Sequence, residues 1–281
     1  MYRKPELIYP PLFIVGAPRS GTTIVLQHLL NNYCFSYIPN ISNKHFFAPL
    51  HYLSKSYIKC AYINNFNSNY GVIEGDMSPS DGWNIFNRFF YVYKDKIVRS
   101  RDLTLLARIV ATIEYRFSLP FINKNNANSN RIKHLSVLFP DAMFLYVERD
   151  ITPTVSSLLK ARREHNISRR KWWGISPVGF AKRNFDSELE RCVVQTYCVN
   201  KSIVNALSGL GDKRVISIKF EEFIRHPEIV LSLVSEQYRC CGVSLTKRGG
   251  EADLYVKRTQ DVPEGLSEEI AGILEGMCND C

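Results

Sequence analysis

The chain has 281 residues, of which 45% are hydrophobic and 22% are charged, a composition typical of a globular protein with a sizeable core. No apolar run approaches the roughly 20 residues of a membrane-spanning helix, and the apolar stretch at residues 12–16 is too short for a signal sequence. We therefore expect a cytoplasmic protein. The formal net charge of +9 favours an anionic ligand. Eight scattered cysteines contain a single CxxC pattern, at residues 278–281, which predicts reduced thiols and no metal site.

Short apolar runs alternate with stretches of helical spacing along the chain. The runs that predict strands lie at residues 12–15, 71–74, 119–122, 142–147 and 215–218. The stretches that predict helices lie near residues 24–30, 83–90, 103–117, 130–139, from 152 onward, 185–208 and 227–238. Residues 34–70 are rich in Asn, Ser and Tyr and predict irregular structure with one short helix. The alternation predicts one α/β domain over residues 1–281, in which helices cover both faces of a mostly parallel sheet of about five strands.

A glycine-containing loop, GAPRSGTT at residues 16–23, stands between the first strand and the first helix. In that position, unpaired backbone N–H groups converge on an anion, and the glycines let the backbone approach it closely. The loop is similar to the phosphate loop GxxxxGK[ST], but Thr22 stands in place of its lysine and the cation is Arg19. The missing lysine, with no evident magnesium-binding carboxylate, disfavours the alternative of a P-loop kinase.

The loop also resembles the 5′-phosphosulfate loop of sulfotransferases that use 3′-phosphoadenosine 5′-phosphosulfate (PAPS), which reads Pro-(Lys/Arg)-Ser-Gly-Thr-(Thr/Ser). The matching residues are Pro18, Arg19, Ser20, Gly21, Thr22 and Thr23. A second family signature is an arginine at a strand end and a serine eight residues later, and Arg149 and Ser157 match it, with Ser156 as a neighbouring alternative. The resemblance covers about residues 11–245, and it is strongest to the bacterial and Golgi-type branches.

The resemblance implies a P-loop-like fold, PAPS as the sulfuryl donor and adenosine 3′,5′-bisphosphate (PAP) as the product. It implies that residues 18–23 bind the phosphosulfate, and that Arg149 and Ser157 bind the 3′-phosphate. The chain departs from the family in two places. Ile24 stands where some members carry a tryptophan that stacks on adenine. The late basic loop that helps to hold the 3′-phosphate is matched loosely, by Arg248 in the sequence KRGG or by the pair Lys257-Arg258.

Sulfuryl transfer needs in-line placement, compensation of the charge on the leaving phosphate, and a base for the acceptor proton. We expect Arg19 to carry the compensating charge, and Lys124 to reach the transferring group from the sheet edge. For the base we expect Glu74, at the end of its predicted strand, with Asp76 and His45 as alternatives. No metal is needed, because the donor is already activated.

Residues 160–183 contain eight basic residues against one acid, Glu164, and therefore carry +7. We expect an acceptor-facing insertion here, in which Trp172 and Trp173 either line the site or anchor a loop. An aromatic and basic wall suits a small-molecule or carbohydrate acceptor, such as a hydroxyl or amine on a glycan, a glycolipid or another metabolite. No RNP, KH or zinc-finger pattern supports a nucleic-acid partner. A catalytically silent nucleotide-binding or polymer-binding protein of this fold remains the other alternative.

Overall fold

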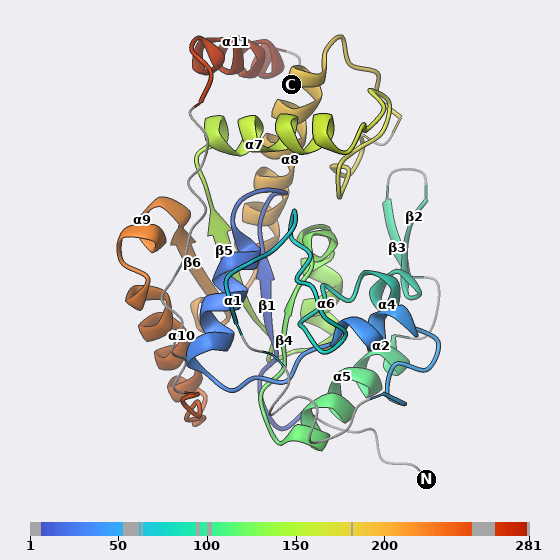
Figure 1. Cartoon of the computed structure of the whole chain (residues 1–281), viewed down its shortest axis with the longest axis vertical. Helices are drawn as coiled ribbons and strands as arrows, with labels where there is room; N and C mark the ends of the chain where they lie inside the picture. Colours follow the sequence, from blue (N-terminus) through green and yellow to red (C-terminus); the bar gives the residue numbers. More distant parts are fainter. Residues whose placement is uncertain are drawn as a thin grey trace.

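A parallel sheet of four strands lies at the centre of the computed structural model, which describes residues 7–52, 62, 64–93, 96–99, 103–180, 182–248 and 262–279 (Figure 1). The strands are β1 (Leu12–Val15), β4 (Ile122–Lys124), β5 (Met143–Glu148) and β6 (Val215–Lys219). They are ordered β4-β1-β5-β6, so β1 and β5 are central. The carboxyl ends of all four strands therefore meet at one edge, where open α/β sheets bind their ligands.

The sheet core is built from large apolar side chains on the two central strands. Every residue of β1 is buried, and so are the first five residues of β5, which is expected for parallel strands covered on both faces. The register places Phe13 opposite Phe144, and their ring centroids are 5.8 Å apart. Phe121 and Phe139 also pack against the Phe13 ring. These contacts fix the strand from which the glycine loop departs.

The helices follow the strands in the order expected of an α/β protein. They are α1 (Thr22–Asn32), α2 (Asn40–Lys44), α4 (Trp83–Asn87), α5 (Thr104–Phe117), α6 (Ile132–Leu138), α7 (Ile151–Glu164), α8 (Glu188–Leu207), α9 (Phe220–Arg225), α10 (Glu228–Cys240) and α11 (Leu266–Asn279), with short 3₁₀ turns at Asn126–Asn130 and Asp212–Arg214. A hairpin of β2 (Phe90–Tyr93) and β3 (Lys96–Arg99) lies apart from the sheet.

Two groups of helices cover the sheet and extend it (Figure 1). Helix α1 packs against β1 and β4, α8 packs against β5, and α9 and α10 pack against β6. Helices α7, α8 and α11 share a second apolar cluster that includes Val155, Leu158 and Ile270. Ser187 is the N-cap of helix α8, and its Oγ accepts from the Glu190 N–H at 2.9 Å. This start fixes the connection from α7, which borders the site described below.

The α/β fold and its parallel sheet agree with the sequence prediction, but the sheet has four strands instead of about five. Residues 71–74 were expected to form a strand, and they contain only an isolated bridge between Asn69 and Val72 around Gly71. Val72 is 62% exposed and Ile73 is buried, so this short apolar run belongs to a surface turn. The hairpin β2–β3 and helices α9 and α11 were not predicted.

Candidate functional site

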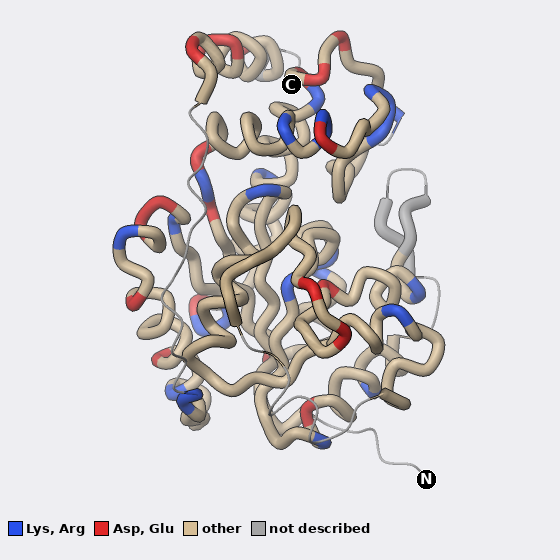
Figure 2. The backbone as a smooth tube through the Cα atoms, viewed as in Figure 1, with Lys and Arg blue, Asp and Glu red and all other residues tan. Residues whose placement is uncertain are grey.

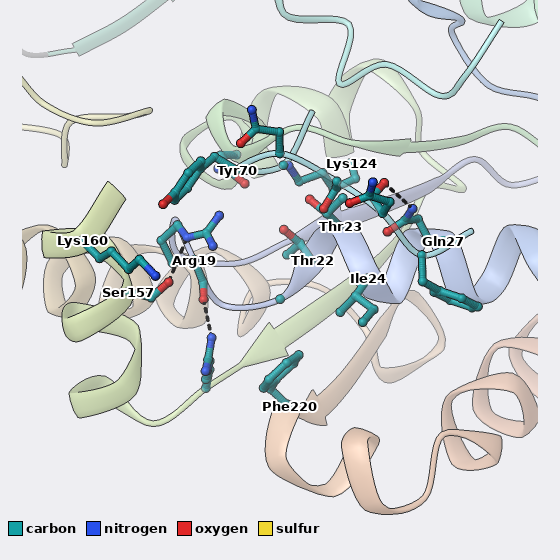
Figure 3. Close-up of a pocket in the computed structure, with 18 of the residues that line it drawn as sticks. Arg19, Thr22, Thr23, Ile24, Gln27, Tyr70, Lys124, Ser157, Lys160 and Phe220 are labelled. Carbon is teal, nitrogen blue, oxygen red and sulfur yellow. Dashed lines mark hydrogen bonds between the residues drawn. The ribbon is translucent and has the colours of Figure 1, made fainter. Parts of the chain in front are cut away.

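A cavity of about 960 Å³ opens at the carboxyl edge of the sheet (Figure 3). Each of the four strands leads to a residue that lines it: Arg19 after β1, Lys124 at the end of β4, Arg149 after β5 and Phe220 after β6. The other walls are the start of α1, the inner face of α7, and a segment that we call the strap (residues 64–71). Of the predicted donor-binding residues, six thus line one cavity, whereas Pro18 and Ser20 do not; the six are Arg19, Gly21, Thr22, Thr23, Arg149 and Ser157.

The loop after β1 is held in a conformation that requires glycine at two positions. Gly21 has φ +95°, and a Cβ on it would collide with the Phe220 ring. A Cβ on Gly16 would lie 2.9 Å from the Val147 carbonyl oxygen. Arg19 also has a positive φ, of 71°, which is uncommon for a residue with a side chain. The loop is therefore a tight turn whose backbone faces the cavity.

The beginning of α1 offers hydrogen-bond donors that the protein does not use. No side chain caps this helix, so the N–H groups of its first turn have no partner within the helix. Thr22 and Thr23 in that turn line the cavity. The Ser20 hydroxyl is buried and has no hydrogen-bond partner among the described residues. Such a convergence of free donors at a helix N-terminus suits a bound phosphate or sulfate.

Two arginines connect this loop to the end of β5 and to α7. Arg149 Nη1 donates to the Arg19 carbonyl at 2.9 Å, and Arg19 Nε donates to Ser157 Oγ at 3.1 Å. Figure 3 shows Arg19 lying between Tyr70 and Ser157. Burial lowers the pKa of both guanidinium groups, but arginine keeps its charge in proteins. An anion entering the cavity would therefore compensate two cations that the fold holds partly desolvated.

Lys124 brings a third cation to the cavity from β4. It is 6% exposed, and a Cβ placed on Gly71 would lie 3.3 Å from its Nζ and 3.4 Å from Thr23 Oγ1. Burial lowers the pKa of Lys124; the charge of Asp81 opposes this effect and that of Arg19 adds to it. No carboxylate of the described residues forms an ion pair with it. The ammonium group is placed to meet an anion that also contacts Thr23.

Arg149 and Ile24 border an apolar part of the cavity beside Phe220. The Arg149 guanidinium carbon lies 4.6 Å from the centroid of the Phe220 ring, and Ile24 and Pro153 also line the cavity. Phe220 is the first residue of α9, directly after β6. The sequence did not single out Phe220, although its position at the end of a predicted strand was a usable signal.

The strap closes the opposite wall, and its position was not predicted. Its Tyr70 ring lies 4.9 Å from the guanidinium carbon of Arg19, and its hydroxyl donates to the carboxylate of Glu164. Gln27 and Asn64 fix the strap to α1, because the Asn64 amide donates to the Gln27 carbonyl at 2.9 Å and the Gln27 amide donates to the Asn67 carbonyl at 3.3 Å. The strap therefore extends from α1 across the cavity to α7.

Helix α7 contributes four polar residues to the cavity lining, because Ser156 lines it together with Ser157. Ser157, Lys160 and Glu164 are spaced by three and four residues, so they share one side of the helix. Lys160 Nζ lies 3.5 Å from a carboxylate oxygen of Glu164. This spacing is visible in the sequence, and it was the signal that could have identified Glu164 as a site residue.

The two tryptophans after α7 have different roles. Trp172 packs against Phe185 at 5.3 Å between ring centroids and under the Arg191 guanidinium at 4.8 Å, so it anchors the connection between α7 and α8. Trp173 lines the cavity, and Gln195 of α8 donates to its carbonyl at 2.7 Å. One tryptophan thus lies at the cavity and the other is packed within the connection.

The basic residues of the same connection also differ in their surroundings. Arg162 is completely buried; it donates to the carbonyls of Lys171 at 2.6 Å and Ser168 at 3.1 Å, and it lies 3.4 Å from Glu188. Its charge therefore holds the connection in place. Figure 2 shows basic residues gathered along the rest of this connection. The exposed ones are Arg163, Arg169, Arg170, Lys171, Lys182 and Arg183.

Glu74, the predicted base, does not line the main cavity. It lines a separate hollow of about 110 Å³, whose wall contains strap residues that also line the cavity. Glu74 follows the turn at Gly71, and it does not stand at the sheet edge, because residues 71–74 do not form a strand. Asp76 is exposed, and the His45 ring stacks on Tyr52. Neither of these alternatives lines the cavity.

Arg248 is also placed away from the cavity. Its guanidinium donates to the carbonyl of Leu30 at 3.1 Å and to that of Tyr62. Leu30 is near the C-terminal end of α1, whereas the glycine loop precedes the N-terminal end. The structure therefore does not bring Arg248 together with Arg149. Lys257 and Arg258, the other predicted location of the late basic loop, lie outside the described residues.

In the described part of the chain, no group of three or more His, Cys, Asp or Glu side chains is arranged to hold a metal ion. None of the helices formed by these residues combines the length and apolar character needed to cross a bilayer.

Comparison with known proteins agrees with this geometry. Residues 10–245 match the model of the sulfotransferase family. Among solved structures, sulfotransferase STF9 from Mycobacterium avium superposes with a TM-score of 0.56 at 13% identity, covering 96% of this chain and 69% of that one. Sulfotransferase STF1 from Mycobacterium tuberculosis gives 0.54 at 14% identity, covering 85% and 69%. The sulfotransferase domain from the curacin biosynthetic pathway gives 0.50 at 12% identity, covering 96% and 99%. No curated protein matches in sequence.

Proposed function

This chain belongs to the sulfotransferase family, and we propose that it transfers the sulfuryl group of PAPS to a hydroxyl or amine of an acceptor, releasing PAP. The observation that carries the proposal is the connection of Arg19 and Arg149 at one cavity, beside the uncapped start of α1. A donor with phosphates at both ends of an adenosine needs two cationic contacts that face the same space.

The charges that line the cavity support a polyanionic ligand. Four lining side chains are cationic (Arg19, Lys124, Arg149 and Lys160), and one, Glu164, is anionic. In our proposal residues 18–23 hold the phosphosulfate, because the loop and the first turn of α1 offer free donors there. Arg149 and Ser157 hold the 3′-phosphate, for which a planar guanidinium fork is suited.

Adenine needs an apolar contact, and the predicted tryptophan is absent. We assign this contact to the surface formed by Phe220 and Ile24, which line the same cavity next to Arg149. An aromatic ring such as that of Phe220 stacks favourably on a base. Phe220 contacts Arg149 from the start of α9 and Ile24 lies in α1, which supports an adenosine held between α1 and α9.

During transfer the acceptor oxygen or nitrogen attacks sulfur, and the bond between sulfur and the bridging oxygen of the 5′-phosphate breaks. Negative charge then grows on the leaving phosphate. Arg19 and Lys124 supply fixed positive charge for it, and the buried position of Lys124 strengthens the interaction, since little water screens it. The hydroxyl groups of Thr22 and Thr23 add neutral donors.

We place the acceptor at the wall formed by Tyr70, Trp173 and Lys160. Aromatic rings next to hydrogen-bonding groups suit a carbohydrate or a similar polar metabolite, and a glycan, a glycolipid or another metabolite would meet this chemistry. The exposed basic residues of the α7–α8 connection lie in the same part of the molecule (Figure 2). They favour acceptors that carry negative charge.

Two measurements test the proposed function. First, PAP should raise the melting temperature of the protein and ATP with magnesium should not; a ligand at 100 times its Kd stabilises the folded state by about 2.7 kcal/mol. The opposite preference would support a P-loop kinase. Second, the protein should transfer labelled sulfate from PAPS to a component of a cell extract. Binding of PAP without any labelled product would instead indicate a silent binding protein.

A further inference from the structure

The acceptor hydroxyl needs a nearby base to take its proton. Among the described residues, the cavity lining contains a single carboxylate, that of Glu164. Glu74 faces the smaller hollow, and the strap residues Asn65 and Asn67 lie in the walls of both spaces. An acceptor hydroxyl in the cavity can therefore reach Glu164 directly, whereas the strap stands between it and Glu74.

Glu164 is held at the mouth of the cavity by two side chains. It is the last residue of α7 and is exposed. Its carboxylate accepts a hydrogen bond from the Tyr70 hydroxyl and lies 3.5 Å from Lys160 Nζ. The Tyr70 ring in turn lies against Arg19, the cation expected at the phosphosulfate. A chain of contacts thus joins this carboxylate to the place where transfer would occur.

We propose that Glu164 is the general base that accepts the proton of the acceptor hydroxyl, and that Tyr70 is the residue that positions it. This inference rests on the proposed sulfuryl transfer. Trp173 also lines this mouth and lies 6.0 Å from Tyr70 between ring centroids. The acceptor would therefore meet a carboxylate and two aromatic rings together.

The proton and the electron pairs balance in this step. The acceptor oxygen forms a bond to sulfur while the bond from sulfur to the bridging oxygen breaks. The bridging oxygen leaves with the electron pair as part of PAP, which Arg19 and Lys124 neutralise. The acceptor proton moves to a Glu164 carboxylate oxygen and gives a neutral carboxylic acid. Because Glu164 is exposed, it returns this proton to solvent after the product leaves.

The charge state of Glu164 fits the task at neutral pH. The Tyr70 hydrogen bond lowers the pKa of Glu164; slight desolvation opposes it, and Lys160 and His165 lower the pKa further. Arg19 is the other charged group that faces it. Glu164 is therefore ionised and ready to accept. A weak base is sufficient here, because an oxygen that is gaining a sulfuryl group loses its affinity for its proton as the bond forms.

The first test compares two glutamates that differ in position. The initial rate of sulfate transfer from labelled PAPS is measured on the extract fraction that the wild-type protein labels. Glu164→Gln should lose about 10²–10⁴-fold in kcat, the usual contribution of a general base, while PAP still raises its melting temperature as in the wild type. Glu74→Gln is the matched control and should keep its rate. A Glu164→Gln rate within about threefold of wild type would overturn the proposal.

The second test separates catalysis from a structural role. Tyr70→Phe keeps the ring over Arg19 but removes the hydroxyl that lowers the pKa of Glu164. The pKa of Glu164 should rise, so the fall of kcat/KM on the acidic side should begin at a higher pH than in the wild type. An unchanged acidic limb in Tyr70→Phe would contradict the assignment, even if the overall rate fell. If both Glu164→Gln and Glu74→Gln lose activity, the acidic limb of the kcat/KM profile of Tyr70→Phe decides which glutamate is the base.

Failure of this inference can be distinguished from failure of the proposed function. A wild-type protein that transfers no sulfate to any fraction would refute the sulfuryl transfer itself. A wild-type protein that transfers sulfate, with Glu164→Gln equally active, would refute only the base. Glu164→Asp provides a further check on folding, because the shorter carboxylate should keep part of the rate that Glu164→Gln loses.

Discussion

The donor wall and the acceptor wall of the cavity are built in different ways. The donor wall consists of strand ends and the turn at residues 16–21, and its geometry follows from glycines and from backbone hydrogen bonds. The acceptor wall consists of the strap and the α7–α8 connection, which hydrogen bonds between segments distant in sequence hold in place. The comparison teaches that the proposed donor wall follows from local backbone geometry, whereas the proposed acceptor wall depends on side-chain contacts between distant segments.

The largest expected effect concerns Gly21, where the donor wall allows no side chain. Gly21→Ala places a Cβ into the Phe220 ring at a positive φ, so we expect a loss of roughly 3 kcal/mol in the free energy of unfolding, from overpacking and left-handed strain together. Gly179→Ala is the control, since Gly179 has φ +90° with nothing within 4 Å of an added Cβ. It should lose only about 1 kcal/mol. Equal losses in denaturant unfolding would show that the contact with Phe220 is unimportant.

A smaller effect is expected on donor affinity. Arg149→Ala removes a charged group that we assign to the 3′-phosphate, so the Kd for PAP should rise about 10- to 100-fold, as for a lost hydrogen bond to a charged group. Arg248→Ala should leave this Kd unchanged, because its guanidinium binds carbonyls near the C-terminal end of α1. Titration calorimetry measures both. A loss of affinity in Arg248→Ala would restore the role that its sequence position indicated.

The smallest effect should be confined to the acceptor wall. Gln195→Ala removes the donor that fixes the Trp173 carbonyl, so we expect the KM for the acceptor to rise several-fold, by about 1 kcal/mol, with an unchanged Kd for PAP. Thr196→Val is the control, since Thr196 is a buried neighbour on α8 whose hydroxyl donates to the Cys192 carbonyl of the same helix. A change in PAP affinity in Gln195→Ala would show that the two walls are not independent.

The donor wall was predictable from the sequence because its signals are local. The apolar run at residues 12–15 and the glycines that follow it form one short segment, and the spacing from Arg149 to Ser157 is a second short segment. The structure brings Arg19 of the first segment and both residues of the second to one cavity. The run at Val72 and Ile73 misled the prediction, because two adjacent apolar residues do not distinguish a strand from a turn that buries one of them.

The acceptor wall was not predictable in the same way. Tyr70 and Glu164 are 94 positions apart, and no local pattern indicates that the strap crosses the cavity to meet α7. Charge counting identified the basic connection but could not show that Arg162 is buried inside it. The placement of these residues depends on tertiary contacts, such as those of Gln27 and Gln195, whose side chains bond to the backbone of other segments.

The hydrogen bond from Arg149 to the Arg19 carbonyl has a consequence for the binding of the donor and product nucleotides. It links the two residues that we propose as phosphate contacts, so a nucleotide that engages both binds at two points, and a nucleotide with a single phosphate keeps only one of these contacts. PAP retains both phosphates after the transfer. It therefore keeps both of the contacts by which PAPS was bound. We therefore expect the Kd for PAP to be close to the Kd for PAPS.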